Sequence, residues 1–367
     1  MSLSKDQHPF YQRLSLNLIS ITILGTLLFI GQNILLPLFF SMLLAGLLIP
    51  VVNFLNKRKI PHVLSITLSL IVSLILLFGI FYFLTTQVLN FLDDSEMIKD
   101  KITHLVLDIK QWVSKNFHVG IRKQNQYLQD TAKEISTSGP KLVSQTFLSI
   151  TEIGSYLLFI PIYTFLLLYY KDLIKKFLIE LFRDGSEEKV ISVMHGCRSV
   201  AQYYVTGLLI EMTIVFALNS LGFLILGIKY AIFLALISAL LNLIPYVGML
   251  VANLFCMLIT LITSQDTGDV IWVAAILSGV QLVDNNVLMP LIVGSKVKIN
   301  ALATIIGILV GGALCGVQGM FLAIPGVAVL KVISDHVDSL KAWGIMMGDK
   351  NGHDEPRILK RARRKLK

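Results

Sequence analysis

The sequence is poor in charged residues and in cysteine. Aspartate, glutamate, lysine and arginine account for 15% of the 367 residues, whereas 55% are hydrophobic and the mean hydropathy is +0.74. A soluble domain of this length would not be so apolar, and the composition therefore predicts an all-α polytopic membrane protein embedded in the lipid bilayer. The three cysteines, Cys197, Cys256 and Cys315, lie far apart, which excludes a CxxC metal pattern and a disulfide framework.

Sequence signatures of enzymes and of nucleotide binding are absent as well. The chain has no HExxH, GxSxG or GxGxxG motif and no P-loop, so we expect neither enzymatic activity nor a bound metal or cofactor. A transporter built from this chain alone would run on an ion gradient or on downhill flux. The net charge of +9 is concentrated in residues 357–367, which predicts a basic cytoplasmic tail near anionic lipid and no nucleic-acid partner.

Long apolar runs predict about six full transmembrane helices. The first two cover residues 16–36 and 38–55 and are joined at Pro37. The basic residues 57–59 behind them should be cytoplasmic, as should both chain termini. The first run is long enough to span the membrane and has no convincing cleavage site, so we expect it to be retained. The remaining spans begin near Val63, Phe147, Val205 and Val270.

Changes in composition predict five segments. A three-span unit covers residues 1–92, and an amphipathic helical insertion outside the membrane covers 93–146. The helices of this insertion should pack on each other or on a neighbouring subunit of a homo-oligomer. Residues 147–204 contain the fourth span and two short helices on the cytoplasmic surface. The transport core is expected in 205–334 and the basic tail in 335–367.

Helix breakers interrupt two long apolar segments of this core, residues 230–263 and 301–334. Each segment could form one kinked helix, which would give about eight spans, or two half-length helices in a re-entrant hairpin. Hairpins place the neutral-to-acidic loop 264–269 outside and Lys296 and Lys298 inside, which fits the positive-inside bias better. The residues expected to shape the broken segments are Pro245, Gly248, Pro290, Gly311, Gly312, Gly316, Gly319 and Pro325.

Hairpins would also give the core an internal symmetry. Residues 205–263 and 270–334 would then be two span-plus-hairpin units that enter the membrane from opposite sides, which is an inverted repeat. The second hairpin should be broken across its glycine cluster, residues 311–319, and again at Pro325. Half-helix ends at such breaks can bind ions or polar solutes, and the alternative is close helix packing at small residues.

Ionisable and amide side chains inside the apolar core are the candidate binding residues. Asp284 is the strongest, because a carboxylate in an apolar span needs a cavity or a partner. With Asn285 and Asn286 it could bind a proton, a cation such as sodium or a small polar solute, and the alternative is a structural hydrogen bond between helices. Glu211 is a second candidate titrating group, although it could instead reach toward the cytoplasmic interface. Further candidates are Asn219 and Asn242.

Three motifs carry a resemblance to a known family. Residues 243–248 (LIPYVG), residues 284–286 (DNN) followed by Pro290, and the glycines of residues 311–319 followed by Pro325 are similar in order and spacing to the AI-2E family of membrane transporters. The resemblance implies a multi-pass protein of the bacterial inner membrane. It also implies export of the furanone autoinducer-2 in some members and exchange of sodium or lithium for protons in others.

We therefore expect a secondary transporter that exports a small polar solute such as autoinducer-2 by alternating access, coupled to protons or cations through Asp284. A sodium(lithium)/proton antiporter and a non-transporting membrane scaffold, whose external helices and basic tail recruit partners, are the alternatives. Two positions depart from the family pattern, namely Met249, where proline is usual, and Asn300-Ala301, where His-Pro is frequent. Both lie near the expected hairpins, where they could alter substrate choice or gating.

Overall fold

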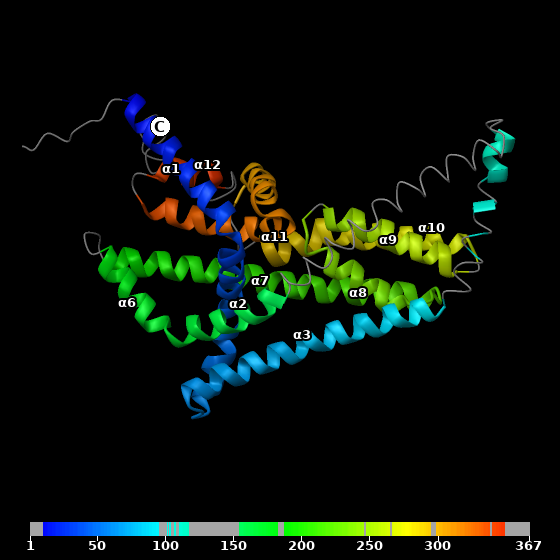
Figure 1. The fold of residues 1–367 in the computed structure, drawn as a ribbon, viewed down its shortest axis with the longest axis horizontal. Helices are drawn as coiled ribbons and strands as arrows, with labels where there is room; N and C mark the ends of the chain where they lie inside the picture. Colours follow the sequence, from blue (N-terminus) through cyan, green and yellow to red (C-terminus); the bar gives the residue numbers. More distant parts are fainter. Residues whose placement is uncertain are drawn as a thin grey trace, which may run out of the picture. The chain divides into compact units, whose positions relative to one another are not determined.

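The computed structural model of the chain is helical through nearly all of the part that it describes (Figure 1). The described residues are 10–94, 101, 103, 106–107, 110–116, 154–182, 187–245, 247–264, 266–294, 299–337 and 340–348. Five of these helices are long and apolar enough to cross a membrane, or six if the bent pair Gly154–Tyr169 and Lys171–Leu181 counts as one span. The fold is that of a polytopic helical membrane protein, as the composition predicts.

The contacts between residues divide the chain into two compact units. Unit 1 comprises residues 1–46, 170–204 and 296–367, and unit 2 comprises residues 47–169 and 205–295. Most of the predicted external insertion and of the basic tail lies outside the described residues. The domain boundaries drawn from the sequence therefore stay a prediction.

The N-terminal helices are α1 (Phe10–Ile30), α2 (Gln32–Lys57) and α3 (His62–Asp93). The predicted join at Pro37 is wrong, because the break lies at Gly31. A Cβ at Gly31 would lie 2.9 Å from the Leu27 carbonyl oxygen and 3.1 Å from Leu35 Cδ1, so this approach needs a glycine. The backbone of α2 continues through Pro37 and loses one hydrogen bond there.

The segment behind α3 bends before it enters a very long helix. The helix Gly154–Tyr169 is bent by 68° from α6 (Lys171–Leu181), whose Leu173, Phe177 and Leu181 side chains are exposed on one face. The helix α7 (Glu187–Ile225) then runs for 39 residues. The second predicted surface helix is therefore not separate but is the first part of α7, because no proline interrupts it and Glu187 and Glu188 stabilise its N-terminus.

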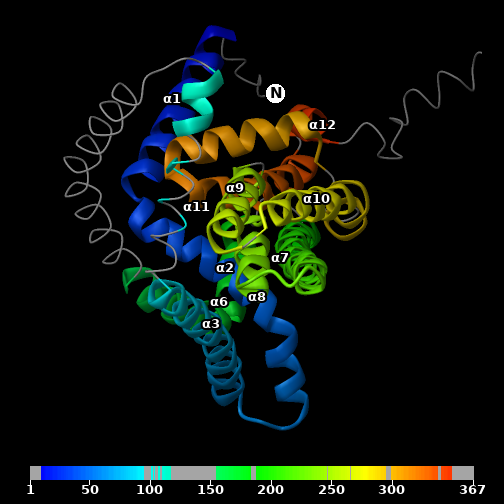
Figure 2. The same cartoon turned by 90° about the vertical axis from the view of Figure 1, so that its right-hand side faces the viewer.

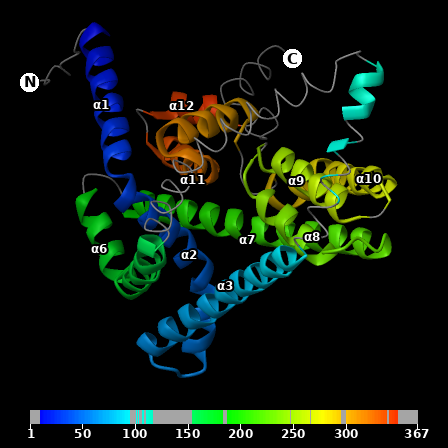
Figure 3. The same cartoon turned by 45° about the vertical axis from the view of Figure 1, so that its right-hand side comes forward.

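The first broken segment forms a hairpin of α8 (Ala231–Leu241) and α9 (Val247–Thr263). Phe233 and Phe255 pack edge to face with ring centroids 6.4 Å apart, and Cys256 Sγ donates to the Leu234 carbonyl at 3.6 Å. These contacts join residues at equal distances from the tip, so the two helices run antiparallel (Figure 3). At the tip, Gly248 is pressed against the Leu241 carbonyl, which leaves no room for a side chain.

The helix α10 (Gly268–Val283) packs beside α9 and then widens into two π-helical stretches, η1 (Asp284–Leu288) and η2 (Pro290–Gly294). Pro290 has no backbone N–H and cannot continue the regular hydrogen-bond ladder. Widened turns of this kind are frequent at functional sites. Together these stretches make one apolar span, Gly268–Ile292.

The second broken segment, α11 (Ala301–His336), also folds back on itself (Figure 2). The backbone is non-helical at Cys315 and at Gly316, which has φ +60° and ψ −147°. A Cβ on Gly307 would lie 2.6 Å from Val327 Cγ2, whereas a straight helix would separate these residues by about 30 Å. Pro325 lies in helical backbone within the second arm, so the additional break predicted there is wrong.

The C-terminal helix α12 (Lys341–Met347) packs on α11. Asn300 holds the start of α11 to the end of α12. Its Oδ1 accepts from the Ala303 backbone N at 2.8 Å, and its Nδ2 donates to the carbonyls of Met346 at 2.5 Å and Gly348 at 3.1 Å. The departure from the family pattern at this position is therefore a capping residue that also binds the following helix.

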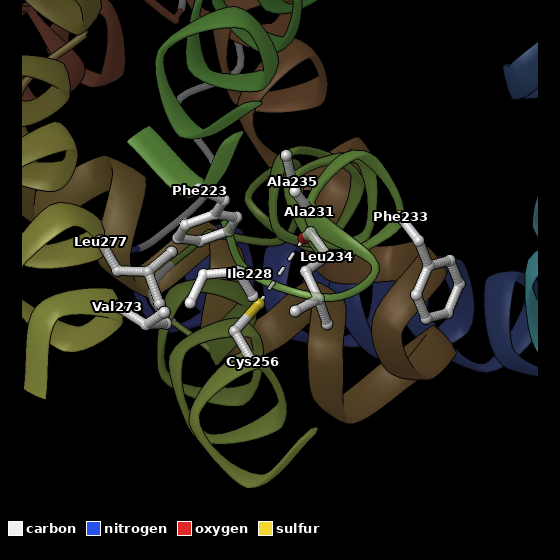
Figure 4. Close-up of a cluster of buried hydrophobic side chains, with 9 residues drawn as sticks. All are labelled: Phe223, Ile228, Ala231, Phe233, Leu234, Ala235, Cys256, Val273 and Leu277. Atoms are coloured by element: carbon white, nitrogen blue, oxygen red, sulfur yellow. Dashed lines mark hydrogen bonds between the residues drawn. The ribbon is translucent and has the colours of Figure 1, made fainter. Parts of the chain in front are cut away.

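A group of buried apolar side chains, which we name the apolar cluster, forms the core of unit 2 (Figure 4). It gathers residues from the end of α7, from the turn that follows it, from both arms of the first hairpin and from α10. Its members are Phe223, Ile228, Ala231, Phe233, Leu234, Ala235, Cys256, Val273 and Leu277.

Candidate functional site

One face of α7 is buried and carries two polar residues. Glu211, Val215, Asn219 and Phe223 recur every four residues and are 6%, 4%, 1% and 0% exposed. Residues four apart lie on the same side of a helix, so these side chains form one stripe along α7, and their low exposure shows that the stripe faces inward. Glu211 is therefore buried among protein and does not reach the aqueous interface.

Asp284 meets Glu211 inside unit 2. It begins the π-helical stretch η1 and is 2% exposed. Its Oδ2 accepts from Asn242 Nδ2 at 3.0 Å and from Gln281 Nε2 at 3.4 Å, and the Glu211 carboxyl lies within hydrogen-bonding reach of the Asp284 carboxyl. We name these four residues the carboxyl cluster.

Three helices supply the carboxyl cluster. Glu211 comes from α7, Asp284 and Gln281 from the α10 span, and Asn242 from the C-terminal end of α8, at the tip of the first hairpin. Gly222 of α7 also packs on Ile276 of α10, so α7 and α10 run antiparallel and bring residues 211 and 284 to the same level. The hairpin tip is thus joined to a carboxyl group inside the span.

The carboxyl cluster has fewer hydrogen-bond donors than its carboxyl oxygens could accept from. Glu211 Oε2 and Asp284 Oδ1 are buried with no donor among the described residues. Two carboxylates in contact repel one another strongly in a medium of low dielectric constant, and a proton or a small cation between them removes that repulsion. Within the described part of the chain no group of three or more acidic, histidine or cysteine side chains could hold a metal ion.

A second polar contact lies farther along α7. Asn219 Nδ2 donates to Ser238 Oγ of α8 at 3.3 Å, and Asn219 Oδ1 is buried without a donor in the described residues. Asn219 is separated from Glu211 by about 12 Å of helix and does not join the carboxyl cluster. Ser238 was not among the candidate residues expected from the sequence. It lies one helical turn before Asn242 on α8, and this spacing could have identified it as a polar residue on the same face.

The two asparagines after Asp284 are not buried with its carboxylate. Asn285 and Asn286 are exposed on the α10 span. Asn285 Oδ1 accepts from Gln281 Nε2 at 3.1 Å, and Asn286 Nδ2 donates to the Leu282 carbonyl at 2.8 Å. Gln281, by contrast, donates to Asp284 Oδ2, and its position one helical turn before Asp284 was the signal that could have identified it.

The glycines of the second hairpin, in unit 1, pack the two arms together. The backbones of Gly311 and Gly319 touch, and a Cβ on Gly312 would lie 2.7 Å from Met320 Cε. Gly316 makes the reversal itself. These positions match the close-packing alternative for small residues.

Sequence comparisons with known proteins find a family of membrane transporters. A profile of AI-2E family transporters matches residues 18–339. YrrI of Bacillus subtilis (strain 168), named as a candidate transport protein, is 27% identical over 320 residues, which cover 83% of this chain and 87% of that protein. YhhT of Escherichia coli (strain K12), named in the same way, is 21% identical over 337 residues, with coverage of 91% and 93%.

Proposed function

Because the chain belongs to the AI-2E transporter family, we propose that it is a secondary transporter that exports a small polar solute such as autoinducer-2. We further propose that the carboxyl cluster carries its coupling ion. Membership of the family supports transport, and the direction and the solute follow from what the family resemblance implies. The ion coupling rests on this protein's own residues.

The contact between two buried carboxyls is the observation that carries the proposal. Glu211 and Asp284 are 6% and 2% exposed, and their carboxyls lie within hydrogen-bonding reach of one another. Burying two carboxyls costs free energy that a structural hydrogen bond would not require, and such residues inside a span commonly mark ion pathways. One proton or monovalent cation between them satisfies both.

The coupling mechanism follows from the position of Asn242. This residue is at the first hairpin's tip and donates to Asp284 Oδ2. An ion that binds Asp284 competes with Asn242 for the carboxylate, so ion occupancy weakens the attachment of the hairpin tip to the α10 span. When the tip of the first hairpin detaches, the carboxyl cluster becomes accessible from the side of the membrane that the tip had covered. Alternating access requires an element that moves in this way.

A sodium(lithium)/proton antiporter is the second candidate, and the carboxyl cluster favours it directly. Both ions would occupy the same pair of carboxyls in turn. In an antiporter the exchange itself is the transport reaction, whereas in an exporter it drives movement of the solute. The two functions can therefore be distinguished experimentally. An autoinducer-2 gradient should move cations across the membrane if the protein is an ion-coupled exporter, and should not move them if it is an antiporter.

The test uses the purified full chain in proteoliposomes, with Asp284→Asn and Glu211→Gln as variants. We expect both to lose proton- or sodium-dependent transport while keeping a monodisperse elution profile. Asn286→Ala is the matched control, because Asn286 is on the same span, is exposed, and bonds its own helix. Unchanged ion dependence in both carboxyl variants would show that the carboxyl cluster does not couple transport.

A further inference from the structure

A three-residue contact ties the end of α3 to the turn before the first hairpin. Lys229 Nζ lies 2.5 Å from Asp94 Oδ2, and the Tyr230 hydroxyl donates to the same Asp94 carboxylate and to the Asn90 carbonyl at 3.3 Å. The Tyr230 ring also packs edge to face on Phe91, with centroids 5.9 Å apart. We name Asp94, Lys229 and Tyr230 the outer latch, because the sequence predicts that α3 ends outside the membrane.

The turn that carries the outer latch also closes the apolar cluster. Residues 226–230 connect α7 to α8. Phe223 lies just before this turn and Ile228 lies within it. Both belong to the apolar cluster, where they are 0% and 6% exposed. The same short turn thus holds Lys229 and Tyr230 on α3 and Ile228 against Cys256 and its neighbours. A movement of this turn that breaks the contacts of the outer latch must also disturb the packing of Ile228 in the apolar cluster.

One residue of this turn, Tyr230, has an unfavourable backbone conformation. Gly227 and Tyr230 have φ values of +69° and +64°, and a bulky residue such as tyrosine rarely adopts a positive φ. Strain of this kind persists where surrounding contacts fix it, and it is concentrated in segments that switch between conformations. The contacts that fix Tyr230 are those of the outer latch.

The outer latch is exposed enough to open. The Lys229 and Asp94 side chains are 41% and 32% exposed, and ion pairs in such positions contribute little to stability. The apolar cluster, by contrast, is fully buried and excludes water. The turn at residues 226–230 therefore joins an exposed ion pair to a buried apolar cluster.

We propose that the outer latch and the apolar cluster form the external gate of the transporter: release of Lys229 and Tyr230 from Asp94 lets the turn at residues 226–230 swing away and opens the path between α7, the first hairpin and α10. This inference rests on the proposed function, because a gate has a role only in a protein that moves a solute. Lys229 and Tyr230 are positioning residues and do not touch the solute.

The test uses Cys256, which is 0% exposed at the centre of the apolar cluster, as a reporter. In a Cys197→Ser, Cys315→Ser background, a small membrane-impermeant thiol reagent is applied to intact cells and, separately, to inside-out vesicles. We expect Asp94→Asn to raise the rate of Cys256 labelling from outside by about two- to fivefold, in keeping with an exposed ion pair. The charge swap Asp94→Lys with Lys229→Asp should return the rate toward that of the parent.

The matched control is Asp93→Asn, which removes the same charge from the neighbouring residue of α3. Equal labelling of parent and Asp94→Asn, an equal rise in Asp93→Asn, or an equal rise from both sides of the membrane would overturn the gate. If Asp94→Asn does not fold, Tyr230→Phe removes the hydroxyl contact alone and should still raise the rate. Labelling needs no transported solute, so failure of the gate and failure of ion coupling at Asp284 are separate results.

Discussion

The reversal at Gly316 gives the sharpest prediction about the fold. Gly316 has φ +60° and ψ −147°, a region that is essentially restricted to glycine, and a Cβ built there meets nothing within 4 Å. Replacement by alanine therefore causes no clash, and its cost is the backbone conformation alone. We expect Gly316→Ala to lower the free energy of unfolding by about 1–3 kcal/mol.

Gly326→Ala is the matched control for this change. Gly326 is in the same helix, in helical backbone, and a Cβ there also has nothing within 4 Å. Alanine should be neutral there or stabilise the helix by up to about 1 kcal/mol. Equilibrium unfolding in mixed detergent micelles measures both variants. If the two lose stability equally, α11 has no glycine-specific reversal at residue 316, and the second hairpin is wrong.

Two further predictions concern regions outside the spans. Asn300→Ala removes the cap of α11 and both bonds to α12, and should cost about 1–2 kcal/mol of unfolding free energy, whereas Asn300→Asp keeps the cap acceptor and should lose less. Lys229 and Tyr230 hold the pKa of Asp94 below its usual 3.8, so the outer latch is present above that value and is lost as the pH falls through the lowered pKa. Burial and the bond to Asp94 raise the pKa of Tyr230 to about 12, with Asp93 adding to the shift. External labelling of Cys256, normalised to a model thiol, should therefore be flat between about pH 5 and 9, and a step near neutral pH would contradict the latch.

The sequence predicted the hairpins because their causes are local. Pro245 and Gly316 act on their own backbone, so they can be recognised without knowing what surrounds them. The break at Gly31 was missed because Pro37 is the stronger breaker in general, and only the close approach of Leu27 to Gly31 shows why glycine is needed. Local chemistry thus predicts where a chain reverses, but close packing decides between two nearby candidates.

The carboxyl cluster illustrates what could not be predicted. Asp284 and Glu211 were each identified as costly in an apolar span, yet their contact depends on the antiparallel register of α7 and α10, which no local pattern encodes. Asn285 and Asn286 were grouped with Asp284 because they follow it in the chain. Successive helical residues point in different directions around the axis, and this turns both asparagines away from Glu211.

The fold-back of α11 decides whether the chain crosses the membrane at this segment or returns to the side from which it came. Its 36 residues would be counted as one crossing by hydropathy, but Ile299 before it and Gly348 behind it pair through a β-bridge. The two ends of the segment therefore face the same compartment. A hydropathy count that takes residues 301–336 as one crossing therefore differs by one crossing from a count that follows the fold-back.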